Sequence, residues 1–228
     1  MTQLEVDKKN NLVELRPSRG KQPGALRMVS RIISSIFHPL FIPVYLSWII
    51  YKIESTVFSG TLNDVGQRFY IPRFILLYTF FPLVSVLLMK GLGFISSIHL
   101  KTQRDRIIPY IVCMIYYWWS WHLFDNQPEY TNLSVTISLA IFIASIGGLI
   151  GNIYMKVSMH AIAAGVMAAF IMLLGYSQPS FGIYISFSLL LAGIICTARF
   201  IDSDHTPKEI YLGFLIGVFS LVIAVYFT

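Results

Sequence analysis

Seven stretches of about 20 mainly apolar residues constrain this chain more than any other feature of its sequence. A helix of roughly 17 to 25 apolar residues is long enough to cross the hydrocarbon core of a bilayer. The candidate spans are Ile32–Tyr51, Phe74–Ile95, Ile107–Leu123, Leu133–Ile153, Ser158–Tyr176, Phe181–Arg199 and Glu209–Phe227. The sequence therefore predicts an all-α fold, a polytopic transmembrane helical bundle with six to seven spanning helices.

The low charge content also indicates that the chain folds in a lipid bilayer. Charged residues make up only 12% of the 228 residues, whereas a soluble domain carries about 25%. One transmembrane domain, residues 31–228, accounts for most of the chain. Residues 1–30 are polar and basic, and we expect them to form a disordered tail or to lie on the membrane surface.

Prolines and glycines modify the predicted spans. Pro39 and Pro43 fall inside the first span and should kink it. Two pairs of glycines have a spacing of four residues, which lets neighbouring helices approach closely. These pairs are Gly147 with Gly151 and Gly213 with Gly217. We interpret all four as packing residues.

Three polar clusters interrupt the apolar pattern. They run from Lys101 to Pro109, from Lys156 to His160 and from Arg199 to Glu209. Two predicted spans separate the first cluster from the second, and two more separate the second from the third. Because an even number of crossings returns a chain to the same face, we expect the clusters to meet on one side of the membrane.

Each cluster has an ordinary explanation when it is considered alone. Lys and Arg at helix ends usually extend their charges to the interface or set the topology. A single His at a membrane boundary is usually structural. The segment from Thr206 to Glu209 also reads as a capping box with Pro207 at the first helical position, so Glu209 has a structural role available.

Taken together, the clusters supply the groups that a phosphate site needs. They carry one hydroxyl at Ser158 and two imidazoles at His160 and His205. Their cations are Lys101, Arg104, Arg106 and Arg199. The second and third clusters also lie at predicted helix N-termini, which favour bound anions. This combination suits a phosphate ester with a leaving alcohol.

The ordered clusters resemble the signature of the type 2 phosphatidic acid phosphatases, whose catalytic core is shared with vanadium haloperoxidases. That signature reads Lys-x6-Arg-Pro, then Pro-Ser-Gly-His, then Ser-Arg-x5-His-x3-Asp. In this chain Arg199 and His205 have the spacing of the third motif, and Glu209 stands where the family has Asp. The resemblance covers roughly residues 100–217.

The second motif is matched at two of its four positions. Ser158 and His160 stand at the family's Ser and His, whereas Val157 and Met159 replace Pro and Gly.

The first motif also departs from the family pattern. Lys101 and Pro109 have the family's spacing, but Ile108 occupies the Arg position. Arg104, one helical turn earlier, could substitute for it if the segment is helical. In the third motif, Ala198 replaces the family's Ser.

The resemblance implies a two-step displacement without a metal or another cofactor. His205 would attack phosphorus and form a phosphohistidine, while Glu209 would orient its imidazole. His160 would protonate the departing alkoxide and then activate water, a double role that suits histidine because its ordinary pKa is about 6.5. The phosphate oxygens would be held by Lys101, Arg104, Ser158 and Arg199. The substrate would be a membrane lipid phosphate monoester or diphosphate.

The remaining histidines do not form a metal-ligand pattern. His38, His99 and His122 lack a plausible ligand spacing, and we interpret each as structural or interfacial.

The distribution of positive charge predicts the side on which the site lies. Of the 17 Lys and Arg residues, 14 lie on the side of the N-terminus and the clusters, and 3 lie on the other side. Without the five residues in or next to the proposed site, the count is still nine against three. The positive-inside rule therefore predicts a site on the cytoplasmic face of a bacterial inner membrane.

Two other functions remain open at this point. A non-catalytic relative could bind or transport an anionic lipid or solute, a reading that the replaced Arg, Gly and Ser favour. A structural membrane subunit could use the basic clusters only to set its topology. The net charge of +6 does not indicate a nucleic-acid partner, since its cations lie mostly in the tail and loops. The lipid and the oligomeric state are likewise open.

Overall fold

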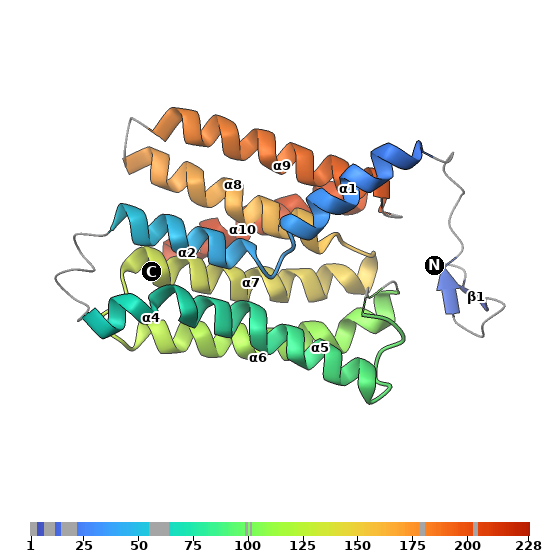
Figure 1. Ribbon diagram of the computed structural model, residues 1–228, viewed down its shortest axis with the longest axis horizontal. Helices are drawn as coiled ribbons and strands as arrows, with labels where there is room; N and C mark the ends of the chain where they lie inside the picture. Colours follow the sequence, from blue (N-terminus) through green and yellow to red (C-terminus); the bar gives the residue numbers. More distant parts are fainter. Residues whose placement is uncertain are drawn as a thin grey trace.

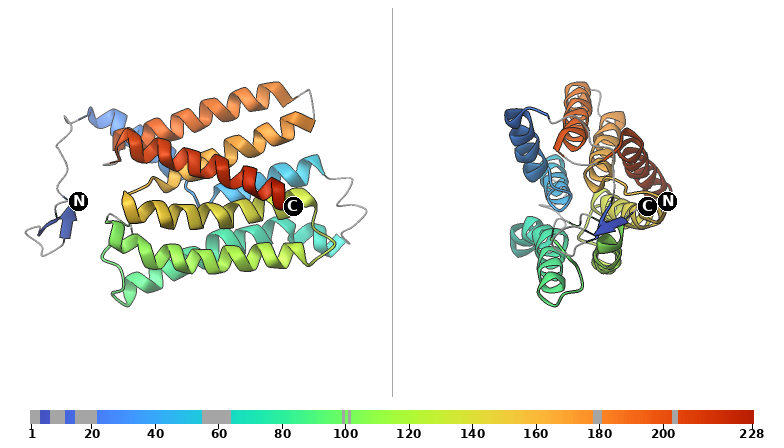
Figure 2. Two further views of the ribbon diagram at one scale, coloured as in Figure 1. Left: turned by 180° about the vertical axis from the view of Figure 1, so that it is seen from behind. Right: turned by 90° about the vertical axis from the view of Figure 1, so that its right-hand side faces the viewer.

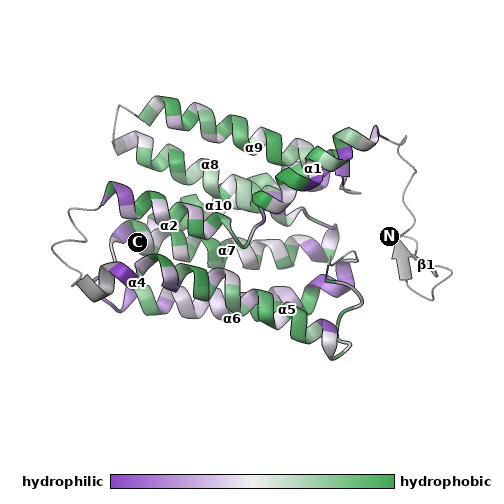
Figure 3. Cartoon of the chain, viewed as in Figure 1, coloured by the Kyte–Doolittle hydropathy of each residue, from purple (hydrophilic) through white to green (hydrophobic). Residues whose placement is uncertain are grey.

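The computed structural model describes residues 4–6, 12–14, 22–54, 64–98, 100, 102–177, 181–202 and 205–228. Its helices lie side by side along the long axis (Figure 1). Five stretches of the described chain are helical, long and apolar enough to cross a membrane. They are Arg68–Gly91, Asn132–Tyr154, Met159–Tyr176, Gly182–Asp202 and Pro207–Phe227. Hydrophobic residues cover the middle of the bundle and hydrophilic residues gather near its ends (Figure 3). These features indicate a polytopic helical integral membrane protein.

The first predicted span, Ile32–Tyr51, is two helices and not one kinked helix. Helix α1 is Gly24–Ile36 and α2 is Ile42–Ile53. The chain leaves the helix before Pro39, because a residue that precedes proline disfavours the helical conformation. Pro43 lies in the first turn of α2, where its missing N–H is not needed. The two helices follow one another in the same direction along the bundle, so the break does not reverse the chain (Figure 1).

The second predicted span, Phe74–Ile95, begins earlier and ends earlier than expected. It consists of α4 (Asp64–Phe74), a π-helical segment η1 (Ile75–Phe80) and α5 (Phe81–Gly91). Phe81 N donates to Leu76 O, a bond five residues back. Pro82 follows immediately and lacks an N–H, and a wider turn of this kind is one way for a helix to accommodate such a loss.

The other five predicted spans are each one helix, with ends that lie within four residues of the prediction. They are α6 (Gln103–Asp125), α7 (Asn132–Tyr154), α8 (Met159–Ser177), α9 (Gly182–Asp202) and α10 (Pro207–Phe227). Thr102, Thr131 and Thr206 cap the N-termini of α6, α7 and α10, because each hydroxyl accepts a backbone N–H of the first turn.

Successive helices alternate in direction, so α6, α8 and α10 begin where α5, α7 and α9 end (Figure 1). The polar segments 102–106, 156–160, 199–202 and 205–209 consequently lie at the same end of the bundle, which we call the cluster end. It is on the right in Figure 1 and faces the viewer in the right-hand view of Figure 2. The arrangement agrees with the common face expected from counting spans.

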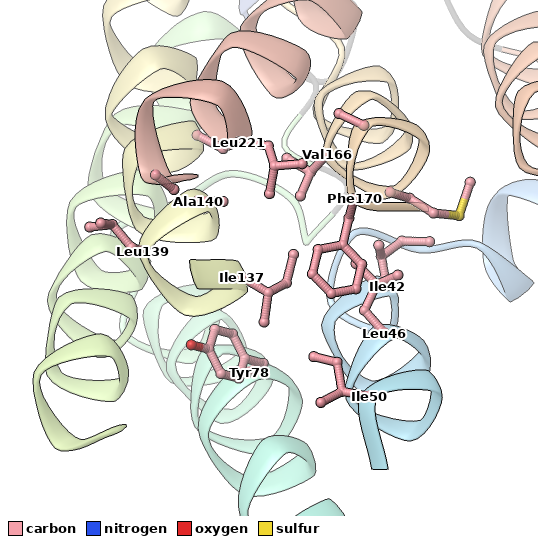
Figure 4. Packing of buried hydrophobic residues seen from close by; sticks show 14 of the residues in the cluster. Ile42, Leu46, Ile50, Tyr78, Ile137, Leu139, Ala140, Val166, Phe170 and Leu221 are labelled. Carbon is pink, nitrogen blue, oxygen red and sulfur yellow. The ribbon is translucent and has the colours of Figure 1, made fainter. Parts of the chain in front are cut away.

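The core lies where α2, η1, α7, α8 and α10 meet. Figure 4 shows Ile50, Tyr78, Ile137, Phe170 and Leu221 pointing into this region from those five elements. All five side chains are buried. Their packing holds the broken first span against the helices that carry the polar clusters.

Glycines let α8 and α10 touch through their backbones. A Cβ on Gly217 would lie 2.1 Å from Ile162 O, and one on Gly165 would lie 2.2 Å from Phe214 O. Gly213 has the same constraint, since its Cβ would lie 2.8 Å from Ser158 O. The predicted packing role of the second glycine pair is confirmed, and a Cβ on either glycine of the first pair would meet Ile216.

The described part of the N-terminal tail contains two short strands. Strands β1 (Leu4–Val6) and β2 (Leu12–Glu14) pair antiparallel, with Leu4 opposite Glu14. The predicted boundary between residues 30 and 31 falls inside α1 (Gly24–Ile36). The apolar residues Leu26, Met28 and Val29 are interspersed with polar ones, so this stretch has a low mean hydropathy although it is helical. A search for apolar runs therefore does not find the start of α1.

Replacing Gly217 by Val should destabilise the protein by about 2 kcal/mol or more, because the new side chain would collide with the backbone of α8. The melting temperature of the purified protein in detergent measures this effect. Gly193→Val is the matched control, since no atom lies within 4 Å of a Cβ at Gly193. Equal melting temperatures for the two variants would contradict the tight α8–α10 contact.

Candidate functional site

The N-terminal ends of α8 and α10 meet at the cluster end. Ser158 N, just before α8, donates to Glu209 O in the first turn of α10 at 3.3 Å. This single backbone bond joins the second sequence cluster to the third. Because Gly213 lies one turn further along α10 against Ser158 O, a larger residue there would push the two helix ends apart.

His205 and Glu209 form a buried pair. His205 Nδ1 lies 3.2 Å from Glu209 Oε2, and the two residues are 3% and 6% exposed. A carboxylate only accepts hydrogen bonds, so Nδ1 is the donor and the lone pair of the neutral imidazole lies on Nε2. The site thus contains an oriented imidazole whose second nitrogen can act as a nucleophile.

Glu209 has the structural role that the sequence allowed for as well. Its Oε2 accepts the Thr206 N–H at 2.9 Å, and Thr206 Oγ1 accepts the Glu209 N–H at 3.3 Å. This is the predicted capping box. Because the cap fixes the carboxylate, it also fixes the direction of the bond to His205.

Burial keeps His205 neutral. Desolvation, together with the charges of Arg106 and Arg199, lowers the pKa of His205 from 6.5 to about 4. The bond to Glu209 opposes this shift and is the smaller effect. At neutral pH the imidazole is therefore uncharged, which is the form that can attack phosphorus.

Arg106 connects the first cluster to the second. Its Nη1 donates to Val157 O at 2.7 Å, its Nε donates to Leu100 O at 2.9 Å, and the residue is 6% exposed. Its charge acts on both His205 and Arg199. Arg106 is thus a fixed cation inside the site.

Arg104 is placed differently. It is exposed, as is Ile108 one turn later, so the helix face that these two residues share points away from the buried Arg106. Lys101, the other predicted cation of this cluster, lies outside the described residues.

Arg199 enters the site from the last turn of α9. It is half-buried, and its charge acts on His160 and His205. Asp202, which pairs with Arg31, offsets part of that charge. The positive charges of Arg106 and Arg199 repel each other. An anion bound near both side chains would therefore be stabilised by both charges.

His160 occupies the first turn of α8. Its Nε2 lies 3.0 Å from Ser34 O of α1, and its ring meets the His38 ring edge to face with centroids 5.3 Å apart. His205 and Arg199 are both within electrostatic reach. The two imidazoles that the sequence singled out therefore lie at the same end of the bundle.

Ser158 is fully buried and caps α8. Its Oγ accepts the Ala161 N–H at 3.4 Å. A hydroxyl that accepts one bond still has a hydrogen to donate, so Ser158 can bind a phosphate oxygen without giving up the cap. The dipole of α8 adds to its preference for an anion.

Sequence reasoning counted Arg106 among the cations of the first cluster without selecting it as a phosphate ligand, and it interpreted His38 as structural or interfacial. Arg106 lies on the same helix face as the buried Pro109 and Tyr110, and this periodicity could have selected it over Arg104. His38 lies in the break between α1 and α2, and no local pattern indicates its contact with His160.

Comparison of the chain with models of protein families, with curated proteins and with solved structures finds no match.

The depressed pKa of His205 predicts how stability depends on pH. Above about pH 6.5 the imidazole is neutral in both the folded and the unfolded state, so its full contribution is present. As the pH falls from about 6.5 to about 4, the unfolded state takes up the proton first and the folded protein loses up to about 3 kcal/mol.

Melting curves of the wild type and His205→Gln between pH 7 and pH 4 test this prediction. Between these two pH values the variant should lose less stability than the wild type. His122→Gln, which replaces an exposed histidine, is the control and should follow the wild type. Parallel curves for all three proteins would show that burial does not hold His205 neutral.

Proposed function

We propose that this protein is a metal-independent phosphatase that hydrolyses a membrane lipid phosphate monoester or diphosphate through a phosphohistidine, in the manner of the type 2 phosphatidic acid phosphatases that its motifs resemble. The observation that carries the proposal is the neutral, carboxylate-oriented imidazole of His205 beside the N-terminus of α8. Arg106 and Arg199 surround this imidazole with positive charge.

In the first step, His205 Nε2 attacks phosphorus and the bond from phosphorus to the leaving oxygen breaks. Glu209 holds Nδ1–H and stabilises the positive charge that the imidazole gains. The negative charge of the bound phosphate favours the protonated form of His160, which gives a proton to the departing alkoxide, so the lipid alcohol leaves neutral.

In the second step, the same His160 takes a proton from water, and the hydroxide attacks the phosphohistidine. The bond from phosphorus to Nε2 breaks, inorganic phosphate leaves, and His205 returns to its neutral form. Arg106, Arg199 and the α8 N-terminus stabilise the equatorial oxygens, whose charge is spread widely in the transition state of phosphoryl transfer.

The proposed placement in the membrane follows from the direction of the helices. The pair α1 and α2, the continuous helix from α4 to α5, and the five helices α6 to α10 would make seven crossings. The cluster end would then lie at the cytoplasmic surface of a bacterial inner membrane, as the positive-inside rule favours. At headgroup depth a phosphate can reach the site while the acyl or isoprenoid chain stays in lipid.

His205→Ala should lower phosphate release at least about a thousandfold, because the nucleophile is lost. The assay uses purified protein in detergent micelles with phosphatidic acid, phosphatidylglycerophosphate or an isoprenoid diphosphate, in the presence of a chelator. Rapid acid-free quenching with ³²P-labelled substrate should trap a base-stable phosphohistidine in the wild type only.

Two results would contradict the proposal. Full turnover by His205→Ala would exclude this mechanism. Binding of the lipid phosphates by the wild type, with neither turnover nor a trapped intermediate, would instead support the alternative of a non-catalytic relative that binds or transports an anionic lipid.

We further propose that Arg106, rather than Arg104, replaces the arginine missing from the first motif. Arg106→Gln should lower kcat/KM about tenfold or more, because a charge-assisted contact to phosphate is lost. The matched variant Arg104→Gln removes an exposed charge two residues away and should stay within about twofold of the wild type. Rates are compared at equal folded fraction, and the reverse ranking would restore Arg104 to the role that helical spacing suggested.

A further inference from the structure

Helix α1 packs on the bundle with its polar side. Ser30 and Ser34 are buried, whereas the larger apolar residues Met28, Val29 and Ile32 are at least half exposed. The contacts of α1 are made mainly with α9, and it lies beside that helix on the outside of the bundle (Figure 2). Small side chains at the interface let the α1 backbone come close to its neighbours, while the apolar face suits lipid.

This close approach brings a backbone carbonyl of α1 to His160. Ser34 O lies 3.0 Å from His160 Nε2, and a carbonyl can only accept, so Nε2 carries the proton. In the neutral imidazole the lone pair then lies on Nδ1. A bond of this kind to one ring nitrogen fixes the tautomer and orientation of a histidine and determines which nitrogen exchanges protons.

The break after α1 supports the same imidazole from a second side. His38 Nδ1 accepts the Leu40 N–H at 3.3 Å, which fixes the His38 ring in the turn. That ring meets the His160 ring at 84°, with centroids 5.3 Å apart. His160 is thus held by one hydrogen bond and one edge-to-face contact, both from residues 34–38.

An ion pair fixes α1 next to the site. Arg31 Nε donates to Asp202 Oδ1 at 2.7 Å, joining α1 to the last residue of α9. Arg31 lies one helical turn before Ser34, and Asp202 lies one turn after Arg199. The ion pair therefore sets the position of the Ser34 carbonyl relative to Arg199, whose charge acts on both His160 and His205.

We propose that α1 is a positioning element of the active site, in which Ser34 O orients His160 as Glu209 orients His205. His160 keeps the proton on Nε2 and carries the transferred proton on Nδ1, giving it to the leaving oxygen and recovering one from water. This inference rests on the proposed phosphatase function, and it assigns the first broken span a role that the family motifs do not include.

A bulky residue on the buried side of α1 tests the proposal. Ser30→Phe should lift α1 from α9, because Ser30 is buried. We expect kcat to fall about tenfold or more, which is part of the roughly 10²–10⁴-fold that general acid–base catalysis contributes. The change in KM should be smaller. Val29→Phe places the same side chain on the exposed side and is the matched control. Ser30→Ala should keep the wild-type kcat, because it adds no volume.

Charge reversal gives an independent arm. Arg31→Asp should lower kcat in the same direction, and the double variant Arg31→Asp with Asp202→Arg should recover most of it, since the ion pair is rebuilt with its signs exchanged. Loss of kcat in the single variant without recovery in the double variant would show that the Arg31–Asp202 ion pair does not position α1.

A spectroscopic arm does not depend on turnover. In ¹⁵N-histidine-labelled protein, two-bond ¹H–¹⁵N correlations should show His160 with its proton on Nε2, the resonance being assigned by its absence in His160→Gln. Ser30→Phe should mix the two tautomers, whereas Val29→Phe should leave the wild-type pattern.

The outcomes separate the two proposals. A Nδ1–H tautomer in the wild type, or equal kcat for Ser30→Phe and Val29→Phe, would overturn the role of α1 and leave the phosphatase standing. A wild type without turnover would end the phosphatase proposal and with it the catalytic role of α1, while the tautomer pattern would still report whether Ser34 holds His160.

Discussion

The contact between α8 and α10 determines whether this chain has a site at all. Gly165 and Gly217 let the two backbones meet in the middle of the helices, and Gly213 lets Ser158 approach at their ends. Helices this close cannot slide without a collision of backbone atoms. The hydrogen bond from Ser158 N to Glu209 O then fixes two helix N-termini side by side, so residues separated by some 50 positions in sequence share one surface.

The charged groups at this junction are tolerated because each one has polar partners. Arg106 donates to two backbone carbonyls, and Glu209 accepts from Thr206 N and His205. These bonds offset the desolvation of the buried charges, which otherwise costs several kcal/mol per ion. Burial affects His205 differently, because it lowers the pKa of the imidazole and leaves the side chain uncharged at neutral pH. Fixed cations beside a neutral His205 imidazole favour the binding of an anion, which is what the proposed phosphatase requires.

Apolar runs predicted the helices well, because length and hydropathy alone decide whether a segment can cross a bilayer. They failed where local stereochemistry intervenes. Pro39 was expected to kink the first span, and the helix breaks there completely. Pro82 follows a π-helical segment whose position no composition rule predicts. The contact of His38 with His160 joins residues 122 positions apart, and only the assembled bundle specifies it.

Two differences from the family motifs, at positions 108 and 157, can be related to the exposed face of α6 and to the packing of Val157. Ile108 and Arg104 share an exposed face, so an arginine at position 108 would not point to the buried side where Arg106 lies. Val157, which replaces the motif's proline, is fully buried, contacts the region of Gly151 and Gly213, and offers its carbonyl to Arg106. Under the proposed relationship to the family, the changes at these two positions would be linked, because Val157 packs between α7 and α10 and also accepts a hydrogen bond from Arg106. Motif comparison treats these positions as independent losses, whereas the packing links them.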